Sequence, residues 1–183
     1  MLKNYLMRMQ GGGDSVQRHS FGWMLWSWLG AFCGILLVAF FNKLFLLSAT
    51  ENIFLIGSFG ASAVLIYGTP HVPYAQPRNL LGGHVISALT AVTIIQYIHL
   101  PIEFQAALAV STAILLMHLT CTLHPPGGAT ALIGVIGGER VHDLGYEFVF
   151  TPVLSGALIM LLVAILVNGL SADGERNYPK SWW

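Results

Sequence analysis

Charged side chains are scarce in this sequence. Only 9% of its 183 residues are Asp, Glu, Lys or Arg, and their charges sum to zero, whereas a soluble domain carries about 25% charged residues. The low share excludes an ordinary soluble domain. The zero balance excludes the basic surface that a nucleic-acid-binding protein needs, so nucleic acid is not an expected partner.

Cysteines, acidic residues within apolar runs and metal-binding motifs are also scarce. The two cysteines, Cys33 and Cys121, lie in or beside apolar runs and form no CxxC pair, which excludes a disulfide framework. The long apolar runs contain no Asp or Glu, and we find no nucleophile motif, no paired acids and no HExxH motif. We therefore expect no enzyme activity, no cofactor and no metal site.

Long apolar runs are what the sequence has instead. Residues 23–41, 104–120 and 148–170 are free of charge over 19, 17 and 23 residues. A helix needs roughly 20 apolar residues to cross the hydrocarbon of a bilayer, so these runs predict membrane-spanning helices. The first run is too long for a secretory signal peptide, and no clear cleavage site follows it. The lipid bilayer is thus an expected partner.

Six apolar segments are expected in all, and they fall into two similar halves. The sequence GASAVL at 60–65 matches GATALI at 128–133, and at the same offset of 68 residues VIS at 85–87 matches VLS at 153–155. Because each half has an odd number of segments, the second half enters the membrane from the opposite side, as in an inverted repeat. Chance similarity between apolar sequences is the alternative. The segments lie at roughly 23–47, 53–67, 80–98, 104–120, 128–137 and 148–170, and the second and fifth are short or interrupted.

The predicted fold class is therefore an all-α membrane protein. It has six membrane-embedded segments in two inverted three-segment repeats, and the alternative is four spanning helices with two re-entrant segments. The expected parts are an N-terminal arm at 1–20, a single transmembrane domain at 21–170 with halves at about 21–98 and 104–170, and a tail at 171–183.

Basic residues set the expected orientation. With six crossings, six of the eight Lys and Arg residues share one side of the membrane, and with four crossings five of them do. Because cytoplasmic loops are enriched in Lys and Arg, both termini are expected in the cytoplasm, with the chain in the inner (cytoplasmic) membrane of the cell. The six residues are Lys3, Arg8, Arg18, Arg78, Arg176 and Lys180, and Lys43 and Arg140 lie opposite them.

The stretch HPPGGATAL at 124–132 is expected to carry the function. Prolines lack an N–H group and disfavour helical geometry in the residue before them, and a broken helix is tolerated in a membrane only where protein or a cavity surrounds it. The helix that restarts after the break offers free N–H groups and the positive end of its dipole, which suit an anion. The expected substrate-binding residues are His124, Pro125, Pro126, Gly127, Gly128 and Thr130, the corresponding Ser58, Gly60 and Ser62 of the other half, and the nearby His118.

Close helix packing is the alternative use of these small residues. For the spacings Gly30-x-x-x-Gly34 and Gly134-x-x-x-Gly138 we favour packing, and for 125–128 we favour a functional break, because a double proline serves packing poorly. An ionisable residue inside a membrane is a functional candidate by default. For the two histidines, the alternative is a neutral imidazole bonded to a carbonyl.

The HPPGGATAL stretch resembles the signature of the HPP family of integral membrane proteins, which is named for the His-Pro-Pro triplet found here at 124–126. The resemblance covers roughly residues 23–170. Family members are usually described with four spanning helices. Similar plant members have been associated with nitrite transport across the chloroplast envelope, so the resemblance implies nitrite transport.

The expected function is transport of a small monovalent anion, with nitrite as the first candidate, through a midplane site built from helix N-termini and hydroxyl groups. Two other functions stay open: a channel for a small neutral solute such as water or ammonia, and a non-transporting scaffold or sensor subunit. Because small pore proteins often assemble, a homo-oligomer is expected.

Overall fold

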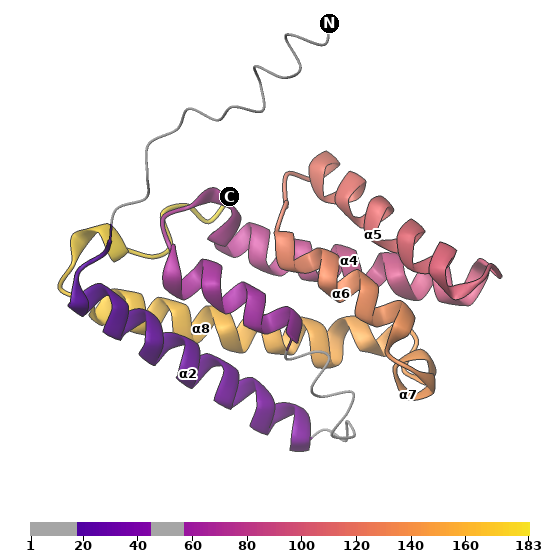
Figure 1. The fold of residues 1–183 in the computed structure, drawn as a ribbon, viewed down its shortest axis with the longest axis horizontal. Coiled ribbons are helices and arrows are strands. Elements are labelled where there is room, and N and C mark those ends of the chain that lie inside the picture. Colours follow the sequence, from indigo (N-terminus) through magenta and orange to yellow (C-terminus); the bar gives the residue numbers. More distant parts are fainter. Residues whose placement is uncertain (1–17, 45–56) are drawn as a thin grey trace, which may run out of the picture.

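The structure is a computed structural model, and it describes residues 18–44 and 57–183. Within these residues every regular element is helical (Figure 1). Most of the predicted arm at 1–20 and the start of the second predicted segment, 53–56, lie outside the described residues. The elements are α2 (Phe21–Leu44), the Gly57–Gly68 helix with its π-helical end η1 (Val64–Gly68), η2 (Pro73–Ala75), α4 (Pro77–Tyr97), α5 (Ile102–Leu119), α6 (Pro125–Ile136), α7 (Glu139–Asp143), η3 (Val149–Leu154), α8 (Ser155–Leu170) and η4 (Gly174–Arg176).

Four helices among the described residues are long and apolar enough to cross a membrane. They are Phe21–Leu44, Pro77–Tyr97, Ile102–Leu119 and Val149–Leu170. The prediction of an all-α membrane protein is confirmed at this level. The Gly57–Gly68 helix and α6 are apolar but shorter. At 1.5 Å per residue the 12 residues of α6 extend about 18 Å, well short of about 30 Å of hydrocarbon.

Prolines set where several helices begin and where one bends. Pro77 opens α4, and Pro125 and Pro126 open α6. In the first turn of a helix the N–H groups have no partner within the helix, so proline, which lacks an N–H, costs no hydrogen bond there. Pro152 instead lies inside the last span, and Thr151 before it has φ −131° and ψ 114°. The last span is therefore kinked at Thr151, inside η3.

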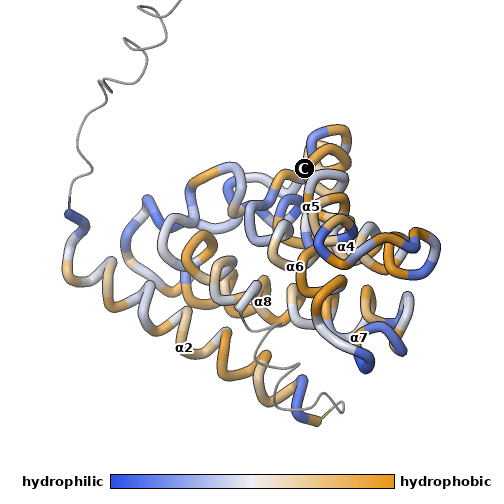
Figure 2. Tube along the Cα trace, turned by 45° about the vertical axis from the view of Figure 1, so that its right-hand side comes forward, coloured by the Kyte–Doolittle hydropathy of each residue, from blue (hydrophilic) through white to orange (hydrophobic). Residues whose placement is uncertain are grey.

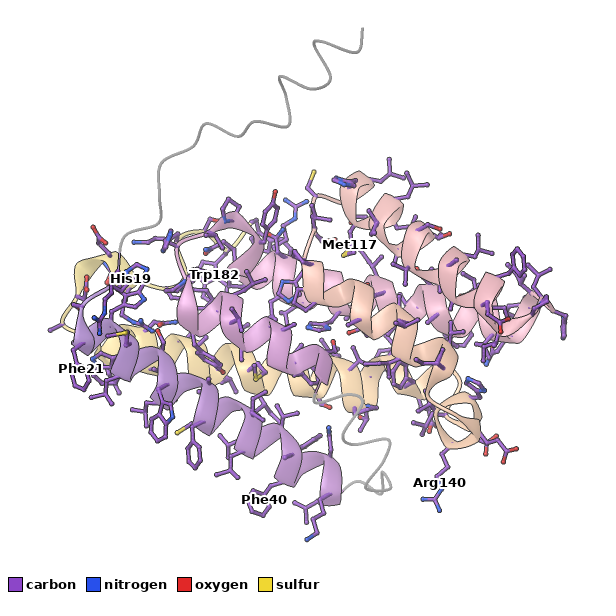
Figure 3. The ribbon with its side chains drawn as sticks, viewed as in Figure 1. His19, Phe21, Phe40, Met117, Arg140 and Trp182 are labelled. Atoms are coloured by element: carbon purple, nitrogen blue, oxygen red, sulfur yellow. The ribbon has the colours of Figure 1, made fainter. Side chains whose placement is uncertain are left out.

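Helices α4 and α8 lie inside the bundle, whereas α2 and α5 lie outside. Half of the residues in the most apolar windows of the two inner spans are buried, against 17% and 22% in the two outer spans. Large apolar side chains are exposed on the outer helices, and Phe21 and Phe40 project outward from α2 (Figure 3). Figure 2 shows hydrophobic residues along the helices and hydrophilic ones at α7 and at several other places, including both ends of α2. Such apolar outer faces suit contact with lipid.

Small residues let the helices pack closely, as the glycine spacings predict. A Cβ atom at Gly30 would lie 2.6 Å from the Tyr67 ring, one at Gly34 would meet the hydroxyl of the same ring, and one at Gly134 would lie 2.5 Å from a Cβ of α4. The packing interpretation is confirmed for these three residues and wrong for Gly138. That glycine has φ +86° and open space around it, so it serves the turn before α7.

The start of α2, the start of α4 and the end of α8 share one end of the bundle. Arg176, just after α8, donates to the backbone oxygen of Trp23 at 3.1 Å and to the Ser27 hydroxyl at 3.0 Å. Gln76, just before α4, accepts a hydrogen bond from the backbone N–H of Lys180 at 2.8 Å. Figure 1 shows α2 and α8 side by side along the long axis of the molecule.

Candidate functional site

The two short helices meet at Ser58. Its hydroxyl oxygen, on the Gly57–Gly68 helix, lies 2.6 Å from the hydroxyl oxygen of Thr130 and 3.2 Å from the carbonyl oxygen of Pro126, both on α6. Ser58 and Thr130 are buried. In Figure 1 the two helices run in opposite directions, the Gly57–Gly68 helix toward the left and α6 toward the right. The non-helical stretch ends at His124, and residues 125–128, predicted as the break, form the first turn of α6 instead. The start of α6 thus lies against the first described turn of the other short helix.

His84 on α4 joins this contact from a third helix. Its Nδ1 lies 2.7 Å from the Thr130 hydroxyl oxygen, and its Nε2 lies 2.8 Å from the Ser62 hydroxyl oxygen. The side chain is fully buried, and its ring lies against Phe59 with the centroids 5.0 Å apart. Sequence reasoning missed His84, although an ionisable residue within an apolar span is a signal that marks it.

His124 completes the group of polar side chains. Its Nε2 lies 2.9 Å from the Ser62 hydroxyl oxygen, and its Nδ1 lies 2.8 Å from the backbone oxygen of Tyr74. The rings of His84 and His124 lie 5.0 Å apart. The five side chains make one continuous series of hydrogen bonds, which we call the hydrogen-bonded chain: Ser58, Thr130, His84, Ser62 and His124.

The hydrogen-bonded chain is buried and carries no fixed charge. All five side chains are at most 1% exposed, and none of them is Asp, Glu, Lys or Arg. Each has at least one hydrogen-bond partner, as buried polar groups require. In the part of the chain that the structure describes, no three His, Cys, Asp or Glu side chains lie close enough to hold a metal ion.

Glycines let the backbone of α4 approach the start of α6. A Cβ atom at Gly127 would lie 2.8 Å from the Ser87 hydroxyl oxygen and 2.9 Å from the backbone oxygen of Gly83. A Cβ atom at Gly83 would in turn collide with the Cβ atom of His124. These contacts bring His84 and His124 within reach of the same hydroxyl group, Ser62.

The start of α6 offers fewer free amide donors than the sequence predicts. Pro125 and Pro126 occupy the first turn and have no N–H group. The N–H of Gly127 donates to the backbone oxygen of His124 at 2.8 Å. Hydroxyl and imidazole groups therefore supply the polar atoms at this helix start.

The predicted site residues divide into two groups. Six of them belong to the hydrogen-bonded chain or lie directly beside it: Ser58, Ser62, His124, Pro126, Gly127 and Thr130. Four others lie outside it. Pro125 and His118 are exposed, Gly60 lines a hollow against α2, and a Cβ atom at Gly128 would meet only a Val110 methyl group at 3.9 Å.

Side chains from three elements cap the end of the Gly57–Gly68 helix. Arg176 donates to the Tyr67 oxygen at 2.8 Å, and the side-chain amide of Asn168 donates to the Ile66 oxygen at 3.0 Å. The indole N–H of Trp23 donates to the last carbonyl of the helix at 3.1 Å. Burial lowers the pKa of Arg176, yet a guanidinium group stays charged. A cation at this end also suits the helix dipole.

The tail supports the turn that holds His124. The Tyr178 hydroxyl donates to the Ala75 oxygen at 2.7 Å, next to Tyr74, whose oxygen is the partner of His124 Nδ1. Burial raises the pKa of Tyr178, so its hydroxyl keeps its proton at neutral pH. The tail is therefore linked to the hydrogen-bonded chain through the turn η2.

Comparisons with known proteins identify the family. The model of the HPP transmembrane region matches residues 16–179, so the chain belongs to the HPP family of transmembrane proteins, and the resemblance is confirmed. A transmembrane protein of Dictyostelium discoideum is 46% identical over 182 residues, which cover 98% of this chain and 57% of that protein. A second one is 50% identical over 161 residues, covering 86% and 55%. The chain thus spans little more than half the length of these relatives, and no solved structure matches it.

Proposed function

We propose that this chain transports a small monovalent anion, with nitrite as the first candidate, through the junction of its two short helices. One observation carries the proposal. Inside an apolar helix bundle, two short helices and α4 gather five buried polar side chains that have no fixed charge. Polar residues inside a membrane are expensive and tend to mark the path of a substrate.

The relation between the short helices supports an inverted repeat. Ser58 contacts the Pro126 oxygen, and these two residues correspond at the 68-residue offset. Ser62 and Thr130, which also correspond, both bond to His84. The two helices run in opposite directions in Figure 1. Transporters with inverted repeats place the substrate at the repeat interface between broken helices and expose it to either side by rocking one half.

The same relation supports six membrane-embedded segments with both termini in the cytoplasm. The start of α2, the end of α8 and Gln76, two residues before Arg78, lie at one end of the bundle. Arg78 then shares the cytoplasmic side with Arg176 and Lys180, as the excess of basic residues predicts. Assembly of several copies stays a prediction from the sequence.

The chemistry of the junction favours a weakly held anion. Hydroxyl and imidazole N–H groups can replace water around an ion at low cost, and a site without a fixed cation lets the ion leave again. A small neutral solute needs the same hydrogen bonds. It differs from an anion in one observable: its flux proceeds when no anion is transported.

The test is flux into liposomes that contain the purified protein. Nitrite, nitrate, formate, chloride and ammonia are offered singly, and protein-free vesicles set the background. The proposal expects saturable uptake of nitrite above background, which unlabelled nitrite competes away. Uptake of ammonia without any anion would instead identify a neutral-solute channel, and no flux of any solute would leave the scaffold alternative.

A further inference from the structure

The backbone oxygen of Tyr74 fixes the direction of the hydrogen-bonded chain. A carbonyl oxygen only accepts, so His124 Nδ1, at 2.8 Å from it, must carry a proton. In a neutral imidazole the other nitrogen is an acceptor. His124 Nε2 therefore accepts a hydrogen bond from the Ser62 hydroxyl at 2.9 Å.

The same reasoning continues to Ser58. The single proton of Ser62 points to His124, so at its 2.8 Å contact with His84 it accepts from Nε2–H. His84 Nδ1 is then the acceptor and receives the Thr130 hydroxyl proton at 2.7 Å. Thr130 in turn accepts from Ser58 at 2.6 Å. With both histidines neutral, every donor points the same way, from Ser58 toward Tyr74.

At the Ser58 end of the hydrogen-bonded chain, the direction in which the hydroxyl groups donate can reverse. If a proton binds the Nδ1 lone pair of His84, the Thr130 hydroxyl must turn away and donate to Ser58. Ser58 then donates to the Pro126 oxygen, which already lies 3.2 Å away. Two hydroxyl rotations thus leave every donor with an acceptor.

His124 lacks an equally good route. A second proton on its Nε2 would force the Ser62 hydroxyl to donate to the Ser58 backbone oxygen, at 3.5 Å, the limit of a hydrogen bond. Ser62 would also have to accept from both histidines at once. The geometry therefore favours His84 as the position of an added proton.

A protonated His84 has no acidic partner. Among the described residues, the groups that contact its ring are Ser62 and Phe59 from the Gly57–Gly68 helix, and Thr130 and His124 from α6 and the residue before it. Of these only His124 titrates, and it is a base. An unpaired buried charge is strongly unfavourable. A monovalent anion bound at the junction would supply the missing countercharge.

We propose that His84 takes up one proton with each anion, so that the protein moves the two together as an electroneutral pair. This inference rests on the anion transport proposed above. The proton forms an N–H bond at Nδ1 when the anion binds. The same bond breaks when proton and anion leave on the other side, and both histidines are neutral again.

A pH gradient tests the coupling. Vesicles with an interior one pH unit more alkaline than the outside should accumulate nitrite about tenfold through the protein, since one proton moves per anion. The initial rate above protein-free vesicles is measured, because nitrous acid itself crosses bilayers. A voltage set with potassium and valinomycin should leave this rate unchanged. A voltage-driven rate that ignores the pH gradient overturns the proton coupling but not anion transport, whereas absence of any carrier-mediated anion flux overturns the proposed function.

Matched variants locate the proton. His84→Gln keeps a donor for Ser62 but cannot be protonated, so accumulation driven by pH should fall to the protein-free level, and by a larger factor than nitrite exchange falls in the same variant. His99→Gln, in an exposed loop, should behave as the parent protein. If His84→Gln does not fold, Ser58→Ala is used instead, because it removes the hydroxyl that reaches the Pro126 oxygen and should reduce the accumulation. Full accumulation in a folded His84→Gln or Ser58→Ala protein overturns the inference.

Nitrogen-15 NMR of labelled histidine gives a readout independent of flux. At alkaline pH, the proton should sit on Nδ1 of His124 and on Nε2 of His84. On adding nitrite at acid pH, His84 should become protonated on both nitrogens while His124 stays neutral. A proton on Nδ1 of neutral His84, or a His84 that stays neutral with nitrite bound, contradicts the proposal.

Discussion

The hydroxyl oxygens of Ser58 and Thr130 lie 2.6 Å apart and join two short helices from different halves of the chain. Both residues are buried, so the contact lies away from the surface of the molecule. Through Thr130 the contact extends to His84, and three helices thereby share one set of polar side chains. The arrangement makes the junction sensitive to single changes in volume or hydrogen bonding.

Two adjacent glycines in the HPPGG stretch should respond differently to alanine. Gly127→Ala places a Cβ atom 2.8 Å from the Ser87 hydroxyl oxygen and 2.9 Å from a backbone oxygen of α4, and such overpacking destabilises by about 1–3 kcal/mol. Gly128→Ala meets nothing closer than 3.9 Å and gains helix propensity of up to about 1 kcal/mol. Thermal unfolding in detergent measures both. Equal destabilisation by the two changes would contradict the packing described here.

Loss of Arg176 should loosen the end of the Gly57–Gly68 helix. Arg176→Gln removes donors to the Trp23 and Tyr67 oxygens, and hydrogen bonds to charged groups are worth about 1.5–3 kcal/mol each. We expect a lower unfolding temperature in detergent. The control is Arg140→Gln, since Arg140 projects away from the molecule (Figure 3) and should change stability by less than about 0.5 kcal/mol. Similar unfolding temperatures for both variants would argue against a capping role of Arg176.

Labelling of single cysteines should separate six crossings from four. In a background in which Cys33 and Cys121 are replaced, Arg78→Cys should react with an impermeant thiol reagent only after the cells are opened, because Arg78 lies near the tail. Arg140→Cys should react from outside in intact cells. Labelling of position 78 from outside would support four crossings with re-entrant short helices.

The sequence predicted the spans because long charge-free runs have one favourable environment. It also predicted a break at His124, but it began the fifth segment at 128, whereas α6 begins at Pro125. The prolines and glycines were treated as the break itself, although proline fits the first turn of a helix. Four of the five members of the hydrogen-bonded chain, all except His84, were among the substrate-binding residues expected from the sequence. His84 was missed because the third segment was treated only as a span, and because its partners on two other helices depend on long-range packing that no local pattern encodes.

Helical spacing separates two of the predicted residues from the hydrogen-bonded chain. Ser58 and Ser62 are four residues apart, so they lie on one face of a helix, whereas Gly60, between them, lies on the opposite face. Pro126 and Thr130 have the same relation to Gly128. The structure follows this spacing, since Gly60 lines a hollow beside α2 and Gly128 faces Val110.

The most direct test of the central claim, that the junction of the short helices is the transport site, is nitrite flux through Thr130 variants in liposomes. Thr130→Val keeps the shape and removes the hydroxyl, and losing a hydrogen bond to a charged group costs about 1.5–3 kcal/mol, roughly a tenfold to hundredfold drop in flux. Thr130→Ser keeps the hydroxyl and should restore most of the flux, and Thr93→Val, on an exposed part of α4, should leave it unchanged. Unfolding temperatures are measured on the same samples. Unchanged flux in Thr130→Val, or a loss no larger than its unfolded fraction explains, would contradict the account.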